Sequence, residues 1–156
     1  MVRHRHRKGG FTLIELAGVV MIVGILAGVA VPAIQYAILK ADAAHMVADS
    51  HTVQLAAYAY LSENGTFPTS GGYGTIPPQL TDYLPDNYSF TYKGAQYMWF
   101  GMNYPNTSNS WGTRTLGAFI IRYTQRPDFA EPMYSYWTPG QDTYWSTSYF
   151  YYLYYG

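Results

Sequence analysis

The feature that most constrains this chain is a long apolar run near its N-terminus. From Phe11 to Ile34 the sequence reads FTLIELAGVVMIVGILAGVAVPAI, 24 residues in which Glu15 alone is charged. As an α-helix the run would measure about 36 Å, which is long enough to cross the apolar core of a bilayer. It therefore predicts a helix that needs lipid or other protein around it.

Basic residues precede this run. Arg3, Arg5, Arg7 and Lys8 lie within the first eight positions. Positive charge on that side predicts an N-terminus in the cytoplasm, with the rest of the chain outside. A basic leader before an apolar run is typical of a targeting signal, so we predict no nucleic-acid partner. Without the leader, five Lys and Arg face nine Asp and Glu, a net side-chain charge of −4.

Three interpretations of the apolar run compete. A plain membrane anchor fits its length but leaves Glu15 unexplained. A conventional secretory signal cleaved near Ala30 or Ala33 has suitable small residues, but its apolar region would be long and would carry a carboxylate. The third interpretation gives Glu15 a function, because an acid inside a membrane is costly and usually marks a functional contact.

The residues around Glu15 point to a family. The sequence KGGFTLIEL at 8–16 resembles the prepilin cleavage motif of type IV pilins and type II secretion pseudopilins. The resemblance implies that residues 1–10 are a prepilin leader peptide. A prepilin peptidase would cut after Gly10 on the cytoplasmic side of the membrane and would methylate the new amine of Phe11.

The same resemblance suggests how subunits would join. The new α-amino group of Phe11 is cationic at neutral pH. In a core of packed helices, Glu15 of one subunit would meet the Phe11 amine of a neighbour, and Thr12 would add a hydrogen bond nearby. Such a buried pair favours one register more than it adds stability.

Small and helix-breaking residues share one face of the apolar helix. Gly24, Gly28 and Pro32 are four residues apart. The two glycines permit close helix contact, and the proline removes a backbone donor. Pro32 also matches a proline that recurs in pilins, which implies that this stretch lengthens or melts in a filament. Glycine and proline are, however, common in transmembrane helices generally.

Residues 11–34 are the expected membrane-spanning and filament-core segment. The pattern of residues 35–63 predicts an amphipathic continuation of the same helix. We expect this helix to end near Ser62–Gly65, where Asn-Gly is a typical C-terminal stop. The predicted polar stripe consists of Gln35, Asp42, Asp49 and Glu63. The predicted packing face consists of Ala37, Ala41, Ala44, Val47, Ala48, Leu55 and Tyr58. His45 and His51 have no metal-ligand spacing, so we expect them to pack or to lie at the surface.

Residues 64–156 predict a tyrosine-rich α+β domain. AYAYLSENGTFP at 57–68 resembles the end of the long pilin helix, and LTDYLP at 80–85 resembles the segment after that helix in pilins. Strands are expected at 88–92, 96–102, 116–123 and 149–155, with a hairpin turn at Gly94 and loops at 69–79, 103–113 and 124–142. We expect three or four antiparallel strands on the alanine face of the helix, whose apolar half protrudes. This is the α+β pilin-like fold.

The C-terminus is dense in aromatic residues, which we interpret as a strand with aromatic cross-strand pairs; a surface that binds glycans or other subunits is the alternative. The chain contains no Cys, so no disulfide closes this region. Some pseudopilins use calcium here, and Asp128, Glu131 and Asp142 are weak candidate ligands in no fixed calcium-loop pattern. We otherwise expect no metal and no cofactor.

No catalytic motif is visible, and we expect no enzyme. The first functional prediction is a structural subunit of a type IV pilus-like filament that polymerises with related subunits through a membrane assembly platform. The precursor would span the inner membrane, and the product would be an extracellular pilus. The alternatives are a type II secretion pseudopilin in a periplasmic pseudopilus, a membrane-anchored aromatic surface-binding module that does not polymerise, and, last, a secreted enzyme.

Overall fold

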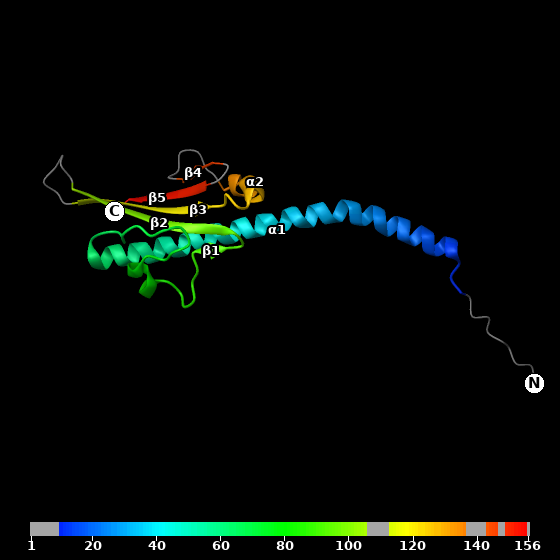
Figure 1. Cartoon of the computed structure of the whole chain (residues 1–156), viewed down its shortest axis with the longest axis horizontal. Coiled ribbons are helices and arrows are strands. Elements are labelled where there is room, and N and C mark those ends of the chain that lie inside the picture. Colours follow the sequence, from blue (N-terminus) through cyan, green and yellow to red (C-terminus); the bar gives the residue numbers. More distant parts are fainter. Residues whose placement is uncertain (1–9, 106–112, 137–142, 147–148, 156) are drawn as a thin grey trace, which may run out of the picture. The chain divides into compact units, whose positions relative to one another are not determined.

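The computed structural model of the chain describes residues 10–105, 113–136, 143–146 and 149–155 (Figure 1). In chain order the elements are α1 (Leu13–Asn64), the 3-10 helix η1 (Pro78–Tyr83), β1 (Thr91–Tyr92), β2 (Ala95–Pro105), β3 (Thr113–Arg122), the 3-10 helix η2 (Pro127–Phe129), α2 (Ala130–Tyr134), β4 (Thr143–Trp145) and β5 (Tyr149–Tyr155). The predicted α+β class is confirmed. The chain divides into two compact units, residues 1–38 and 39–156.

In the first unit, α1 carries apolar side chains on all sides. All its residues from Leu13 to Ile38 are exposed, and Leu13 and Val29 are exposed by 86% and 74%. By length and composition α1 is able to cross a membrane. Exposed apolar surface of this extent has to be covered by lipid or by another protein.

In the second unit, α1 ends where the sequence predicts. Its last residue is Asn64, and Gly65 comes next with φ 72°. The Gly65 amide donates to the carbonyl of Leu61 over 2.8 Å. Glycine suits this left-handed position because it has no Cβ to clash.

The sheet of the second unit is antiparallel, with the order β1-β2-β3-β5-β4. One residue row crosses it as Trp99, Phe119 and Tyr152, and the next as Tyr97, Ile121 and Phe150. These rows share one core with the buried side of α1, whose apolar members are Ala43, Met46, Val53, Ala56 and Ala57. The aromatic strand expected at 149–155, at an edge or in the core of the sheet, is β5, and it lies inside the sheet between β3 and β4.

Two opposed glycines make room in this core. Gly101 of β2 pairs with Gly117 of β3. A Cβ at Gly101 would lie 1.8 Å from the carbonyl oxygen of Pro68, and one at Gly117 would lie 2.5 Å from the Trp99 ring. The space admits the Trp99 indole, whose Nε1 donates to the Pro68 carbonyl over 3.0 Å.

Most of the predicted packing face of α1 is wrong, although Val47 packs against the core. Ala41, Ala44 and Ala48 are exposed, and Leu55 is exposed by 73%. The buried side includes Asp42, from the predicted polar stripe, together with residues between the two predicted faces. The physical reason is that Lys93 pairs with Asp42, and strand tyrosines hydrogen-bond Asp42 and Asp49, so turning this side inward leaves neither carboxylate without a partner.

Several boundaries also differ from the predictions. The expected loop at 124–142 contains η2 and α2, because a proline is tolerated in the first turn of a helix. The expected loop at 69–79 reaches into η1, and the sheet has a fifth strand, β4, that was not predicted. The expected long turn at 103–113 is partly strand, and its middle lies outside the described residues.

Candidate assembly site

The predicted cleavage point lies just outside the helix. Gly10, Phe11 and Thr12 precede α1 without regular structure, and the Phe11 side chain is 88% exposed. A protease needs an extended, accessible peptide bond, and the Gly10–Phe11 bond lies in irregular backbone two residues before the first helical residue. The structure thus leaves the expected bond open to an enzyme.

Thr12 and Glu15 form a reciprocal cap on α1. Both the backbone amide and the hydroxyl of Thr12 donate to Oε2 of Glu15, each over 2.8 Å. The Glu15 amide donates back to the Thr12 hydroxyl over 3.3 Å. This is a capping box, which satisfies amides that a helix N-terminus leaves without partners. The Thr-x-x-Glu spacing is the sequence signal from which this cap could have been predicted.

The glycines and the proline of the apolar segment are exposed. A Cβ placed at Gly24 or Gly28 would meet nothing within 4 Å. Pro32 lies inside α1 without ending it. Because Pro32 has no amide hydrogen, the carbonyl of Gly28 lacks its usual helical donor. Nothing within the described chain requires glycine at these positions, so any close approach would come from another molecule.

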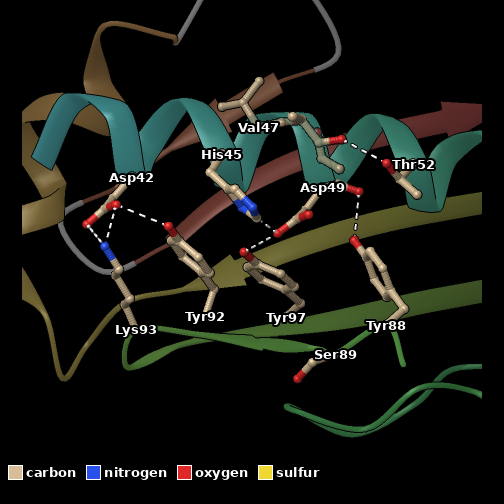
Figure 2. A network of polar contacts seen from close by, with 12 residues as sticks. Asp42, His45, Val47, Asp49, Thr52, Tyr88, Ser89, Tyr92, Lys93 and Tyr97 are labelled. Carbon is tan, nitrogen blue, oxygen red and sulfur yellow. Dashed lines mark hydrogen bonds and ion pairs between the residues drawn. The ribbon is translucent and has the colours of Figure 1, made fainter. Parts of the chain in front are cut away.

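In the second unit, Asp42 anchors the β1–β2 hairpin to α1 (Figure 2). Its side chain is 10% exposed and accepts from Lys93 Nζ over 2.8 and 3.0 Å. The Tyr92 hydroxyl also donates to Asp42 over 3.1 Å. Lys93 and Gly94 form the hairpin turn with φ 44° and 86°, the positive angles that a two-residue type I′ turn requires.

Asp49 joins α1 to the sheet two turns further on (Figure 2). The Tyr97 hydroxyl donates to its Oδ2 over 2.7 Å, and the Tyr88 hydroxyl donates to its backbone carbonyl over 3.1 Å. His45 Nδ1 lies 3.2 Å from the same Oδ2, and its ring stacks on Tyr92 at 4.3 Å. Figure 2 shows these side chains converging between helix and strands. His45 therefore packs at the surface, as expected.

Burial changes the acidity of these tyrosines. Burial, followed by the nearby Asp49, raises the pKa of Tyr88 and Tyr97 far above the usual value of 10.0. Burial raises the pKa of Tyr152 to about 12. The hydrogen bond to Asp42 raises the pKa of Lys93. The hydroxyls of Tyr88 and Tyr97 thus stay protonated and donate to Asp49 of the helix.

The candidate calcium ligands are not gathered into one site among the described residues. Both oxygens of Asp128 accept from Arg126, the nearest contacts being 2.7 and 2.9 Å, and this pairing lowers the pKa of Asp128. Glu131 is exposed on α2, and Asp142 lies outside the described residues. Where the structure is described, no three His, Asp or Glu side chains are grouped so that they could hold a metal ion.

The sequence of this chain is similar to those of known proteins. Residues 5–31 match the family described as the prokaryotic N-terminal methylation motif. The type II secretion system core protein G of Dickeya chrysanthemi is 34% identical over 89 residues, which are 53% of this chain and 58% of that protein. These two findings support the resemblance to type IV pilins and pseudopilins.

The type II secretion system core protein G of Klebsiella michiganensis gives a similar result, with 32% identity over 91 residues. That alignment covers 54% of the chain and 64% of the relative, so the chain spans about three fifths of the length of the curated relatives it matches. No solved structure matches the chain significantly. In both relatives the similarity extends well past the N-terminal motif.

Proposed function

We propose that this chain is a structural subunit of a type II secretion-type pseudopilus, trimmed after Gly10 and methylated at Phe11. The similarity to two proteins named type II secretion system core protein G carries the proposal. Each alignment is about 90 residues long, whereas the methylation motif covers only residues 5–31. The similarity therefore includes residues that a shared processing signal alone would not explain.

This proposal replaces the extracellular pilus that we expected first, because the relatives' names favour the pseudopilin alternative. As a pseudopilin, the chain would be inserted in the inner membrane as a precursor with its N-terminus in the cytoplasm. It would be cut by a prepilin peptidase and joined to related subunits by a membrane assembly platform. No enzymatic step is assigned to it.

The geometry of the N-terminal segment supports a pairing role for Glu15. In the described chain, Thr12 occupies Oε2 of this carboxylate and leaves Oε1 without a hydrogen-bond partner. An incoming Phe11 amine of a neighbouring subunit would take Oε1 while the cap persists. In an apolar helix bundle the amine and the carboxylate are each costly without the other. The pairing would therefore select the one axial register in which the two groups meet. Gly24, Gly28 and Pro32 would permit close packing beside it.

The test compares Glu15→Ala with wild type in a host that supplies a prepilin peptidase and an assembly platform. We expect normal cleavage but a filament yield lower by about tenfold, equivalent to about 1.4 kcal/mol. Glu131→Ala, which removes an exposed acid elsewhere, is the matched control and should assemble normally. Unchanged assembly of Glu15→Ala would rule out the pairing.

A second readout separates the kinds of filament. If the chain is a pseudopilin, it restores protein secretion in a strain that lacks its own core pseudopilin. Fibres on the cell surface without any secretion would instead favour a pilus. Wild-type protein that is cleaved but never polymerises would favour the anchored surface-binding module.

A further inference from the structure

An open apolar groove with an acidic edge lies in the second unit, between α1 and the segment around η1. Its volume is about 470 Å³. The lining residues are Thr52, Leu55, Ala56, Ala59, Asp82, Tyr83, Leu84 and Pro85. A second hollow of about 150 Å³ shares Leu84 and Pro85 with it and adds Asp86. The two hollows are thus neighbours, and Leu55, which lines the larger one, is 73% exposed.

The acids of this surface lack partners in their own chain. Asp82 and Asp86 are exposed, and in the described residues neither side chain has a hydrogen bond or an ion pair. By contrast, Asp42 and Asp128 are paired with Lys93 and Arg126. The groove thus offers apolar walls together with negative charge that the subunit leaves unneutralised.

Lys40 is the complementary feature on the same chain. It is the only Lys or Arg in α1, it is exposed, and where the structure is described it has no ion-pair partner. Ala37, Ala41 and Ala44 are exposed on the same helix face, within one turn of it. Because the side chains around Lys40 are small, the wall of a groove on another molecule could approach this helix face closely enough for an acid there to reach Lys40.

Lys40 cannot reach the groove of its own chain. It precedes Thr52, the nearest groove residue on α1, by 12 positions in one continuous helix. That separation is about 18 Å at 1.5 Å per residue. Any contact between Lys40 and Asp82 therefore has to join two molecules.

We propose that the groove receives the α1 helix of a second copy of this chain, with Lys40 of that copy facing Asp82. The charge of Lys40 is complementary to the acids of the groove, which favours this helix as the occupant. Leu55, Leu84 and Pro85 supply apolar contact. The two surfaces are different patches of one molecule, so the contact is heterologous and propagates into an open helical filament unless the rotation closes. This inference rests on the proposed filament function and names the surface that the globular unit contributes.

The absence of cysteine from the chain makes cross-linking specific. Full-length Lys40→Cys and Asp82→Cys chains, carrying different tags, are expressed together with the assembly machinery and treated with a short bismaleimide. We expect a dimer that carries both tags, and a ladder of multimers from the Lys40→Cys/Asp82→Cys double variant. Glu131→Cys replaces Asp82→Cys as the matched control and should give neither product.

Charge reversal tests the same contact without a reagent. Lys40→Asp and Asp82→Lys should each lower filament yield about tenfold, and the double reversal should restore it to within a few-fold of wild type. Glu131→Lys should leave the yield unchanged. N-terminal processing and circular dichroism of every variant show whether the precursor is still cut and folded.

Two results would overturn the groove while leaving the filament function intact. The first is normal wild-type filaments without any Lys40–Asp82 cross-link. The second is a double reversal that stays defective although it is processed and folded. Loss of membrane-held protein in Lys40→Asp, again without the cross-link, would assign Lys40 to lipid headgroups instead. Wild-type protein that is processed but monomeric would reject the filament function itself.

Discussion

Asp49 is the residue that ties the helix of the second unit to its sheet. Tyr97, which donates to it, is completely buried. A buried hydroxyl that loses its acceptor keeps its full desolvation cost, whereas removing both partners together avoids most of it. The energetic role of Asp49 is therefore measured best through this one pair.

We predict that Asp49→Ala lowers the free energy of unfolding by about 1–3 kcal/mol, because the Tyr97 hydroxyl is left without an acceptor. Tyr97→Phe alone should cost about 1 kcal/mol, and the double variant less than the sum of the two. Urea unfolding of the full chain in detergent, followed by circular dichroism, provides the values. Additive losses would mean that the two groups do not act as a pair.

At the scale of elements, the β1–β2 hairpin depends on its turn. Gly94 has φ 86°, and a Cβ there would lie 3.0 Å from Cγ of Arg126. Arg126 in turn donates to the Lys93 carbonyl over 2.7 Å and pairs with Asp128. The hairpin is thus held by α1 on one side and by the segment after β3 on the other.

Gly94→Ala should lower the free energy of unfolding by about 1–2 kcal/mol, because a residue with a Cβ is strained at positive φ. The matched control is Gly72→Ala, whose Cβ would make only an ordinary contact with Thr75 at 3.8 Å. Chemical unfolding of both variants decides the comparison. Equal free energies of unfolding for the two variants would show that the positive φ at Gly94 does not contribute to stability.

The elements that local chemistry determines were predictable. The Asn64-Gly65 stop, the Gly94 turn and the strand at 149–155 are all encoded by short-range signals. The orientation of α1 was not predictable, because Asp42 and Asp49 turn toward partners about 50 residues away in the sequence, Asp42 being buried and Asp49 half-buried. Their seven-residue spacing looked like a solvated stripe, and only the strand tyrosines and Lys93 make that side the inner one.

Some residues of the candidate site could likewise be predicted from the sequence, and others could not. The motif at 8–16 pointed to Gly10, Phe11 and Glu15 because a prepilin cleavage motif consists of residues that are close together in the sequence. The acidic groove was invisible in the sequence, because α1 and the residues after Gly65 meet there only in the folded chain. The Thr12–Glu15 cap was readable from its spacing but was not predicted.

For the whole molecule, the buried phenols give the stability a pH dependence. Tyr88, Tyr97 and Tyr154 have raised pKa values, mainly through burial, and the pKa of Tyr152 is raised to about 12. A group that holds its proton more tightly in the folded state contributes stability at pH values below its unfolded pKa. That contribution disappears as the pH rises from the unfolded value toward the folded one.

We therefore predict that the free energy of unfolding depends little on these phenols below about pH 10 and falls above it, because the unfolded chain ionises there first. Lys93, whose pKa is also raised, changes stability in the same direction. Urea titrations of the full chain across alkaline pH measure the fall, and Tyr97→Phe should make it shallower. A fall of unchanged slope in Tyr97→Phe would contradict this origin.

If the chain is trimmed and polymerised, its N-terminus in the filament differs in mass from that of the precursor. The protein is isolated from the filament fraction of cells that contain a prepilin peptidase, and its N-terminal peptide is identified by mass spectrometry. We expect a chain that begins at Phe11 with a methylated amine. A chain that still begins at Met1, or that begins after Ala30 or Ala33, would contradict it.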